Sequence, residues 1–145
     1  MPTAARGRSK VVAKESAMAT GLTGYDLLAE ACPTRQVVYR LGDKWTLLVL
    51  YALSQHPHRF RELQRAVEGI SQRMLTQTLR GLERDGLVDR AVAPTTPPQV
   101  TYSLTALGIS LSDVVVRVRV WAYENIERIE IARHSYDAAA DSDMQ

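Results

Sequence analysis

The chain has 145 residues, which is long enough to bury one hydrophobic core and too short for two ordinary domains. Its hydrophobic content of 46% and charged content of 23% exclude a globally disordered chain. The formal net charge of +2 gives only weak support for a nucleic-acid partner. Its single cysteine, Cys32, excludes an internal disulfide framework and a CxxC metal site.

The charges are unevenly distributed along the chain. Residues 1–14 carry four basic residues and no acid, residues 58–90 carry seven arginines against five acids, and residues 112–145 carry four arginines against seven acids. A basic front and an acidic tail are typical of a protein that turns one face toward a polyanion, although such a distribution also arises by chance. The chain start has no apolar run of the secretory type, and the apolar stretch Trp45–Leu53 is too short to span a bilayer. We therefore expect a soluble, cytoplasmic protein without a membrane partner.

The first third of the chain predicts a flexible basic arm over residues 1–24 and then a helix. Pro33 suits the first turn of that helix, and Gly42 favours its end after about Leu41. Its apolar residues, expected to face inward, are Val37, Val38 and Leu41.

A second helix is predicted from Lys44 to about Ser54, with Asp43 as its cap. Its apolar density predicts burial on most sides. The His56-Pro57-His58 segment that follows is interpreted as a break with solvated histidines rather than a metal site.

Two further helices follow this break. The spacing of Leu63 and Val67 predicts a short helix over Phe60–Val67, which Gly69 ends. Ser71 is a suitable N-cap for the next helix, which runs to about Asp85 before Gly86.

The helix that follows Ser71 has two chemically different sides. Leu75, Leu79 and Leu82, joined by Met74, recur at spacings of four and three. The polar side carries Gln72, Arg73, Thr76, Gln77, Arg80 and Arg84. No acid precedes Glu83, although solvated helices usually mix charges of both signs. Because arginine and glutamine make bidentate contacts to guanine and adenine edges, this side predicts a helix that reads double-stranded DNA.

After Gly86 the apolar period becomes two. Residues 87–92 and 100–104 predict two strands, and the proline-rich segment 94–98 predicts the turn between them. A short helix, a turn, a polar-faced helix and a β-hairpin follow the order of a winged helix-turn-helix. The fold class is therefore mainly α with a small β-hairpin wing (α+β), in one domain over residues 25–137.

A long helix is predicted from about residue 105 to about Tyr136, followed by a disordered tail over 138–145. Thirty residues span about 45 Å, longer than a domain of this size can cover. We expect part of its apolar side to pack on a second copy of the chain, and Val114–Val118 also to pack on Trp45 and Leu48 of the same chain. The residues predicted for dimerisation are Leu111, Val114, Val118, Trp121, Ile126 and Ile129.

An ordered set of motifs resembles the HxlR-type regulators, a branch of winged-helix regulators related to the MarR type. The matching motifs are Cys32-Pro33, Leu41–Leu48, Arg59–Leu63, Gly69–Ser71, Met74–Thr76, Leu82–Val88, and Pro97-Pro98 through Tyr102–Thr105. The resemblance implies a homodimer whose terminal helices pair, with one reading helix per subunit.

Three positions depart from the family pattern. Asp43 stands where the family often has glycine, and Gln72 where it often has proline. Gln99 replaces a frequent basic residue, which leaves residues 93–99 of the wing without lysine or arginine. This weakens the case for a wing that enters the minor groove, and Arg90 at the wing base is the remaining basic candidate.

The predicted DNA contacts divide by role. Arg73, Thr76 and Gln77 are predicted to reach base edges, with Gln72 and Arg80 nearby, because the start of the reading helix enters the major groove. Ser71, Arg59 and Arg61 are predicted phosphate contacts. A two-fold dimer predicts a pseudo-palindromic operator with half-sites about one helical turn apart. No cofactor is predicted, and the sequence names no small-molecule inducer.

Cys32 leaves two interpretations open. The helix dipole and nearby Arg35 favour a thiolate, and some members of the resembling family sense oxidants or electrophiles such as quinones and aldehydes with a cysteine at this position. The alternative is a buried, inert cysteine.

Two other functions are alternatives to DNA binding. A winged-helix adaptor would present the polar helix to a protein partner, and the uncharged wing and modest net charge favour that alternative. An enzyme is disfavoured, because the sequence has no Gly-rich phosphate loop, nucleophile elbow or His-Glu metal motif.

Overall fold

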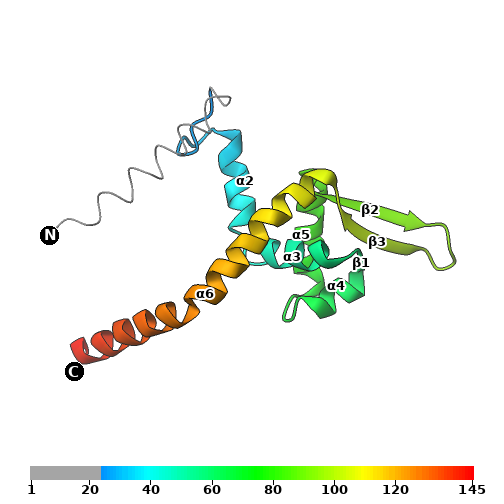
Figure 1. Ribbon diagram of the computed structural model, residues 1–145. Coiled ribbons are helices and arrows are strands. Elements are labelled where there is room, and N and C mark those ends of the chain that lie inside the picture. The colour runs from blue at the N-terminus through cyan, green and yellow to red at the C-terminus, as the bar shows by residue number, and fades with distance from the viewer. Residues whose placement is uncertain (1–23) are drawn as a thin grey trace. The chain divides into compact units, whose positions relative to one another are not determined.

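The structure is a computed structural model that describes residues 24–145 (Figure 1), so the predicted arm lies outside the described residues except for Gly24. The chain divides into two compact units, Met1–Leu41 and Gly42–Gln145. The winged-helix unit therefore begins at Gly42, whereas the sequence predicted one domain from residue 25. Among the described residues, no helix combines the length and the apolar character needed to cross a membrane.

The described part of the first unit contains helix α2 (Pro33–Leu41), with the predicted bounds. The predicted inward face is wrong, because no residue of α2 is buried and Val37 and Val38 are 51% and 47% exposed. The physical reason is that residues 24–41 of this unit contain no second helix or strand on which a face could pack.

Helix α3 (Thr46–Gln55) starts two residues later than predicted. The Asp43 carboxylate accepts hydrogen bonds from the Trp45 backbone N–H and the Thr46 hydroxyl, both at 3.2 Å, and so holds a turn before the helix. The buried residues of α3 are Thr46, Val49, Leu50 and Leu53. The prediction of burial on most sides is wrong on one side, because Leu48 is 50% exposed.

A two-residue strand, β1 (His58–Arg59), leads into helix α4 (Phe60–Ala66). The predicted helix is confirmed, and its Leu63 and the following Val67 are buried. The interpretation of His58 as a solvated loop residue is wrong. His58 pairs with Tyr102 in an antiparallel ladder and is buried.

Helix α5 (Gln72–Arg84) follows the prediction closely. The Ser71 hydroxyl accepts a hydrogen bond from the Met74 backbone N–H at 3.1 Å, which satisfies one of the free donors of the first turn. Gly86, just past the helix, has a φ of +74°, a conformation that glycine adopts without strain.

The wing consists of strands β2 (Val88–Ala93) and β3 (Gln99–Leu104), as predicted. They pair antiparallel from Val88 opposite Leu104 to Ala93 opposite Gln99. The sheet has the order β1-β3-β2, so β1 joins the far edge of β3. Figure 1 shows β2 and β3 projecting from the helices as a two-stranded ribbon.

Helix α6 (Ala106–Asp143) completes the second unit and extends seven residues beyond the predicted end. The predicted disordered tail over 138–145 is therefore wrong for residues 138–143. Its N-cap Thr105 accepts a hydrogen bond from the Gly108 backbone N–H and donates one to the Gly86 carbonyl. With 38 residues, the helix is about 57 Å long at 1.5 Å per residue.

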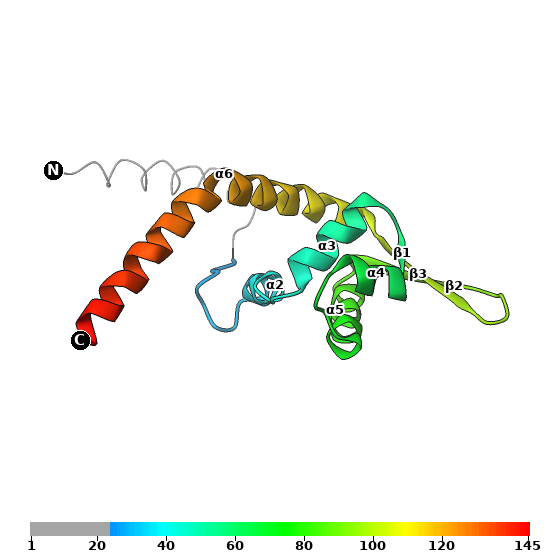
Figure 2. The same cartoon turned by 90° about the horizontal axis from the view of Figure 1, so that it is seen from below.

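The first half of α6 lies along α3 (Figure 2). Its buried residues are Gly108, Ser112 and Val115. A Cβ atom on Gly108 would lie 2.1 Å from the Leu87 carbonyl oxygen, so glycine is needed for this close approach. The expected packing of Val114–Val118 within the chain is wrong for Val114 and Val118, which are each 47% exposed, whereas Val115 between them is buried.

Candidate nucleic-acid interface

Helix α5 presents an exposed polar face opposite its buried leucines. Leu75, Leu79 and Leu82 are at most 2% exposed. The polar side contains Gln72, Arg73, Gln77 and Arg80, which are exposed, and Thr76, which is half-buried. The first turn contains no acidic residue. This face therefore offers cations and amides to a partner without a competing carboxylate at its leading end.

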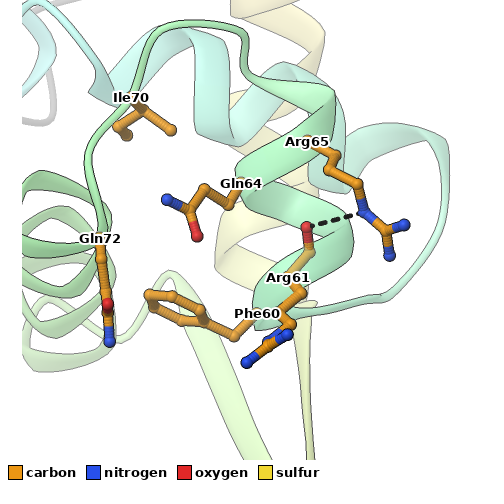
Figure 3. Close-up of a pocket in the computed structure, with 6 residues that line it drawn as sticks. All are labelled: Phe60, Arg61, Gln64, Arg65, Ile70 and Gln72. Atoms are coloured by element: carbon orange, nitrogen blue, oxygen red, sulfur yellow. Dashed lines mark hydrogen bonds between the residues drawn. The ribbon is translucent and has the colours of Figure 1, made fainter.

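A groove of about 610 Å³ lies on one side of this face, between α4 and the start of α5 (Figure 3). Its lining residues are Phe60, Arg61, Gln64, Arg65, Ile70 and Gln72. In Figure 3 the Gln64 amide points across the groove toward α5, while Arg65 turns aside, its Nε donating to the Arg61 carbonyl at 3.3 Å. The predicted residues Arg61 and Gln72 thus share one groove.

A second groove of about 330 Å³ lies between α5 and the wing. Its lining residues are Thr76, Leu79, Arg80, Glu83, Arg90 and Tyr102. The structure therefore places Arg90, predicted at the wing base, beside Arg80 of α5. Glu83 is the one acid in this lining, and it lies near the end of α5 away from Arg73.

Three of the predicted contact residues have side-chain partners within the chain, namely Ser71, which caps α5, and Arg59 and Thr76. The Arg59 guanidinium donates to the Gln99 side-chain oxygen at 2.6 Å, which ties β1 to the wing. The Thr76 hydroxyl donates to the Gln72 carbonyl at 2.8 Å, so this hydroxyl is left as an acceptor for any base edge.

Sequence reasoning missed several groove residues, namely Phe60, Gln64, Arg65 and Tyr102. A signal was present for two of them. Gln64 and Arg65 follow Arg61 by three and four residues, so they share one face of α4. Tyr102 had no such signal, because its place beside α5 depends on how the wing folds back.

The residues predicted for dimerisation form a largely exposed stripe on α6. Val114, Val118, Trp121 and Ile126 are 43–59% exposed, and Leu111 and Ile129 are half-buried. Monomer surfaces usually carry exposed apolar side chains singly, whereas this stripe groups several of them on one helix.

Cys32 immediately precedes α2 and is 6% exposed. The Thr34 hydroxyl lies 2.9 Å from its sulfur, and this hydrogen bond is the main reason that the pKa of Cys32 lies below its ordinary value. The expected help from the Arg35 guanidinium is not seen, because that group donates to Tyr39 and to the Leu28 carbonyl. Across residues 24–145, no three histidine, cysteine or acidic side chains are grouped to hold a metal ion.

The comparisons with known proteins identify the family of the chain. The model of the family described as HxlR-like helix-turn-helix matches residues 40–130. The HTH-type transcriptional regulator YtfH of Escherichia coli is 40% identical over 108 residues, which are 74% of this chain and 86% of YtfH.

Two solved structures have the same architecture. YtfH of Salmonella typhimurium, named as a transcriptional regulator, has a TM-score of 0.71 at 40% identity, covering 76% of this chain and 98% of YtfH. The reduced form of the transcriptional regulator YodB from Bacillus subtilis has a TM-score of 0.56 at 37% identity, covering 63% of this chain and 90% of YodB. YodB has also been solved in a quinone-bound form. The chain belongs to the HxlR-like helix-turn-helix family and is a transcriptional regulator of the helix-turn-helix type.

Proposed function

We propose that this regulator acts as a homodimer that binds specific double-stranded DNA through α5. The observation that carries the proposal is the exposed face of α5, where Arg73, Gln77 and Arg80 lie with no acid in the first turn. Arginine and glutamine provide the donor and acceptor pairs that distinguish base pairs in the major groove.

The two grooves beside α5 support contacts to the DNA backbone. Arg61 lines the groove at α4, and Arg90 lines the groove at the wing. An arginine on each side of the reading helix can neutralise phosphates on both rims of the major groove. Ser71 begins α5, so the positive end of the helix dipole adds to the attraction for phosphate there.

The exposed stripe of α6 supports the homodimer. Val118 and Trp121 lie on a helix about 57 Å long, the second half of which has no other segment of residues 42–145 beside it (Figures 1 and 2). A two-fold pair of such helices would bury the stripe and place two copies of α5 on one side of a duplex. Half-sites about one helical turn apart are the expected geometry.

Selection of bound sequences from a random duplex pool tests this proposal. The expected outcome is a pseudo-palindromic site, and the binding constant on that site should fall steeply with salt, because phosphate contacts release counterions. A pool that shows no enrichment, or binding that is insensitive to salt, would contradict the proposal.

A winged-helix adaptor is the second candidate, because residues 93–99 of the wing carry no lysine or arginine. Such an adaptor would use the same α5 face for a protein partner. The salt titration separates the two functions. A DNA-binding protein shows a steep fall of the logarithm of its binding constant for duplex DNA with the logarithm of the salt concentration, and an adaptor does not.

We also propose that Cys32 responds to oxidants or electrophiles. Its lowered pKa supports a reactive thiolate, and the quinone-bound form of the relative YodB makes quinones a suitable probe. Its burial is the observation that favours an inert thiol. Mass spectrometry after mild peroxide or quinone treatment should find the modification on Cys32, and DNA affinity should then change in the parent but not in Cys32→Ser. An unmodified Cys32 under both treatments would end this part of the proposal.

A further inference from the structure

A third cavity, of about 310 Å³, lies between α3 and the end of α4. Its lining residues are Leu48, Tyr51, Ala52, Gln55, His56, His58, Ala66, Val67 and Glu68. No residue of α5 or of the wing hairpin is among them, so the cavity is separate from the two grooves described above.

Two parallel imidazole rings form part of this lining. The rings of His56 and His58 stack with their centroids 4.0 Å apart and an angle of 9° between their planes. His56 Nδ1 lies 2.7 Å from the Pro57 carbonyl oxygen, and His58 Nδ1 lies 2.7 Å from the His56 carbonyl oxygen.

These contacts fix the tautomer of both rings. A carbonyl oxygen can only accept a hydrogen bond, so each Nδ1 carries the proton and donates it. In the neutral ring the proton then cannot be on Nε2, which is left with a free lone pair. Within residues 24–145, neither Nε2 atom has a hydrogen-bond partner of its own. The two histidines that line the cavity therefore each have one unused acceptor.

The other polar groups of the lining can also accept hydrogen bonds, although the Gln55 amide and the Tyr51 hydroxyl can donate as well. The Glu68 carboxylate only accepts hydrogen bonds, and the Gln55 amide can accept through its oxygen. No lysine or arginine lines the cavity. The walls are apolar side chains from α3 and from the end of α4, among them Leu48, Ala52 and Val67. The lining thus combines apolar walls, several acceptors and the one negative charge of Glu68, and the Arg119 guanidinium lies 5.2 Å from the centroid of the Tyr51 ring in the same lining.

We propose that this cavity binds a small organic cation, an amine or amidine attached to an apolar body. The N–H donors of such a ligand would satisfy the two Nε2 atoms, while Glu68 compensates its charge and the apolar body fills the space beside Leu48 and Val67. A metal ion is a poorer occupant, because the described residues contain no group of three suitable ligands. This proposal does not depend on DNA binding.

The test compares benzamidine with benzoate at pH 8, a pair of the same shape and opposite charge. Isothermal titration calorimetry should detect benzamidine binding at least about tenfold tighter than benzoate binding. In ¹⁵N–¹H spectra the shifted amides should be those of residues 48–58 and 66–68. Equal binding of both compounds, no binding of either, or shifts elsewhere would overturn the proposal.

Two variants and a matched control assign the effect to side chains. Glu68→Gln removes the charge, and His56→Phe keeps a ring for stacking but removes one acceptor. Each should weaken benzamidine binding about tenfold or more, whereas Glu62→Gln, an exposed acid of α4 outside the cavity, should leave it unchanged. Equal loss in Glu68→Gln and Glu62→Gln would show a general charge effect and overturn the assignment. Zn²⁺ bound at His56 and His58 without any benzamidine binding would also overturn it.

Discussion

Helices α5 and α6 both carry leucine, valine or isoleucine at helical spacing, but they use these residues in different ways. In α5 the apolar side is covered by the same chain, with Leu75 and Leu82 fully buried. In α6 a small-residue side packs against the chain at Gly108 and Ser112, and the larger apolar residues Val118 and Trp121 stay exposed.

The difference indicates what each helix has free for a partner. A helix whose apolar side is buried within its own chain has only its polar side to offer, and α5 offers arginines and amides. A helix that keeps an apolar stripe exposed offers the surface that a second chain buries. We therefore propose that α5 binds DNA and that the exposed stripe of α6 binds the second subunit.

The largest expected effect is on stability, at the buried side of α5. Leu75→Ala should lower the free energy of unfolding by about 2–5 kcal/mol, because it removes a fully buried side chain and leaves a cavity. Urea denaturation followed by circular dichroism measures this. The matched change on α6, Ile131→Ala, should cost less than about 1 kcal/mol, because Ile131 is 67% exposed. Equal losses in the two variants would remove the contrast between the helices.

The next effect is on subunit association, at the stripe of α6. Val118→Asp should weaken dimerisation at least about 100-fold, equivalent to about 2.7 kcal/mol, because it places an unpaired charge in the interface. Sedimentation equilibrium gives the dissociation constant. Val116→Asp makes the same change on the opposite side of α6 and should leave association unchanged. If Val116→Asp disrupted the dimer and Val118→Asp did not, the subunit interface would lie on the side of α6 opposite the proposed stripe, and the proposal would be contradicted.

A smaller effect is expected at the start of α5. Ser71→Ala should destabilise the protein by about 0.5–2 kcal/mol, because the Met74 N–H loses the side-chain acceptor that now caps it. Ser110→Ala, on the exposed surface of α6, is the control and should change stability by less than about 0.5 kcal/mol. Thermal and urea unfolding of both variants provide the comparison, and no difference between them would argue against the cap.

The same contrast explains what could be predicted from the sequence. The start and buried side of α5 depend on local signals, an N-cap at Ser71 and leucines at helical spacing, so both were predicted. Strand β1 was missed because two residues form a strand only by pairing with residues 101–102, some forty positions later.

The errors on α6 have a different origin. Apolar spacing identifies a stripe, but it does not say which of two adjacent sides packs within the chain. Close approach at Gly108 selects the side with small residues, which a search for apolar residues overlooks. The helix also continues past Tyr136 because Ala138–Ala140 are strong helix formers and nothing in that segment stops a helix.

The most direct test of DNA binding by α5 is a binding measurement that compares two arginines of this helix. Arg73 lies in the first turn and Arg84 in the last, and both are exposed. On a duplex selected by the parent protein, Arg73→Ala should weaken binding by about 1–3 kcal/mol, roughly 5- to 150-fold, while Arg84→Ala should change it less than about threefold. Unchanged affinity in Arg73→Ala, or equal losses in both variants, would contradict the assignment of α5 as the helix that reads DNA.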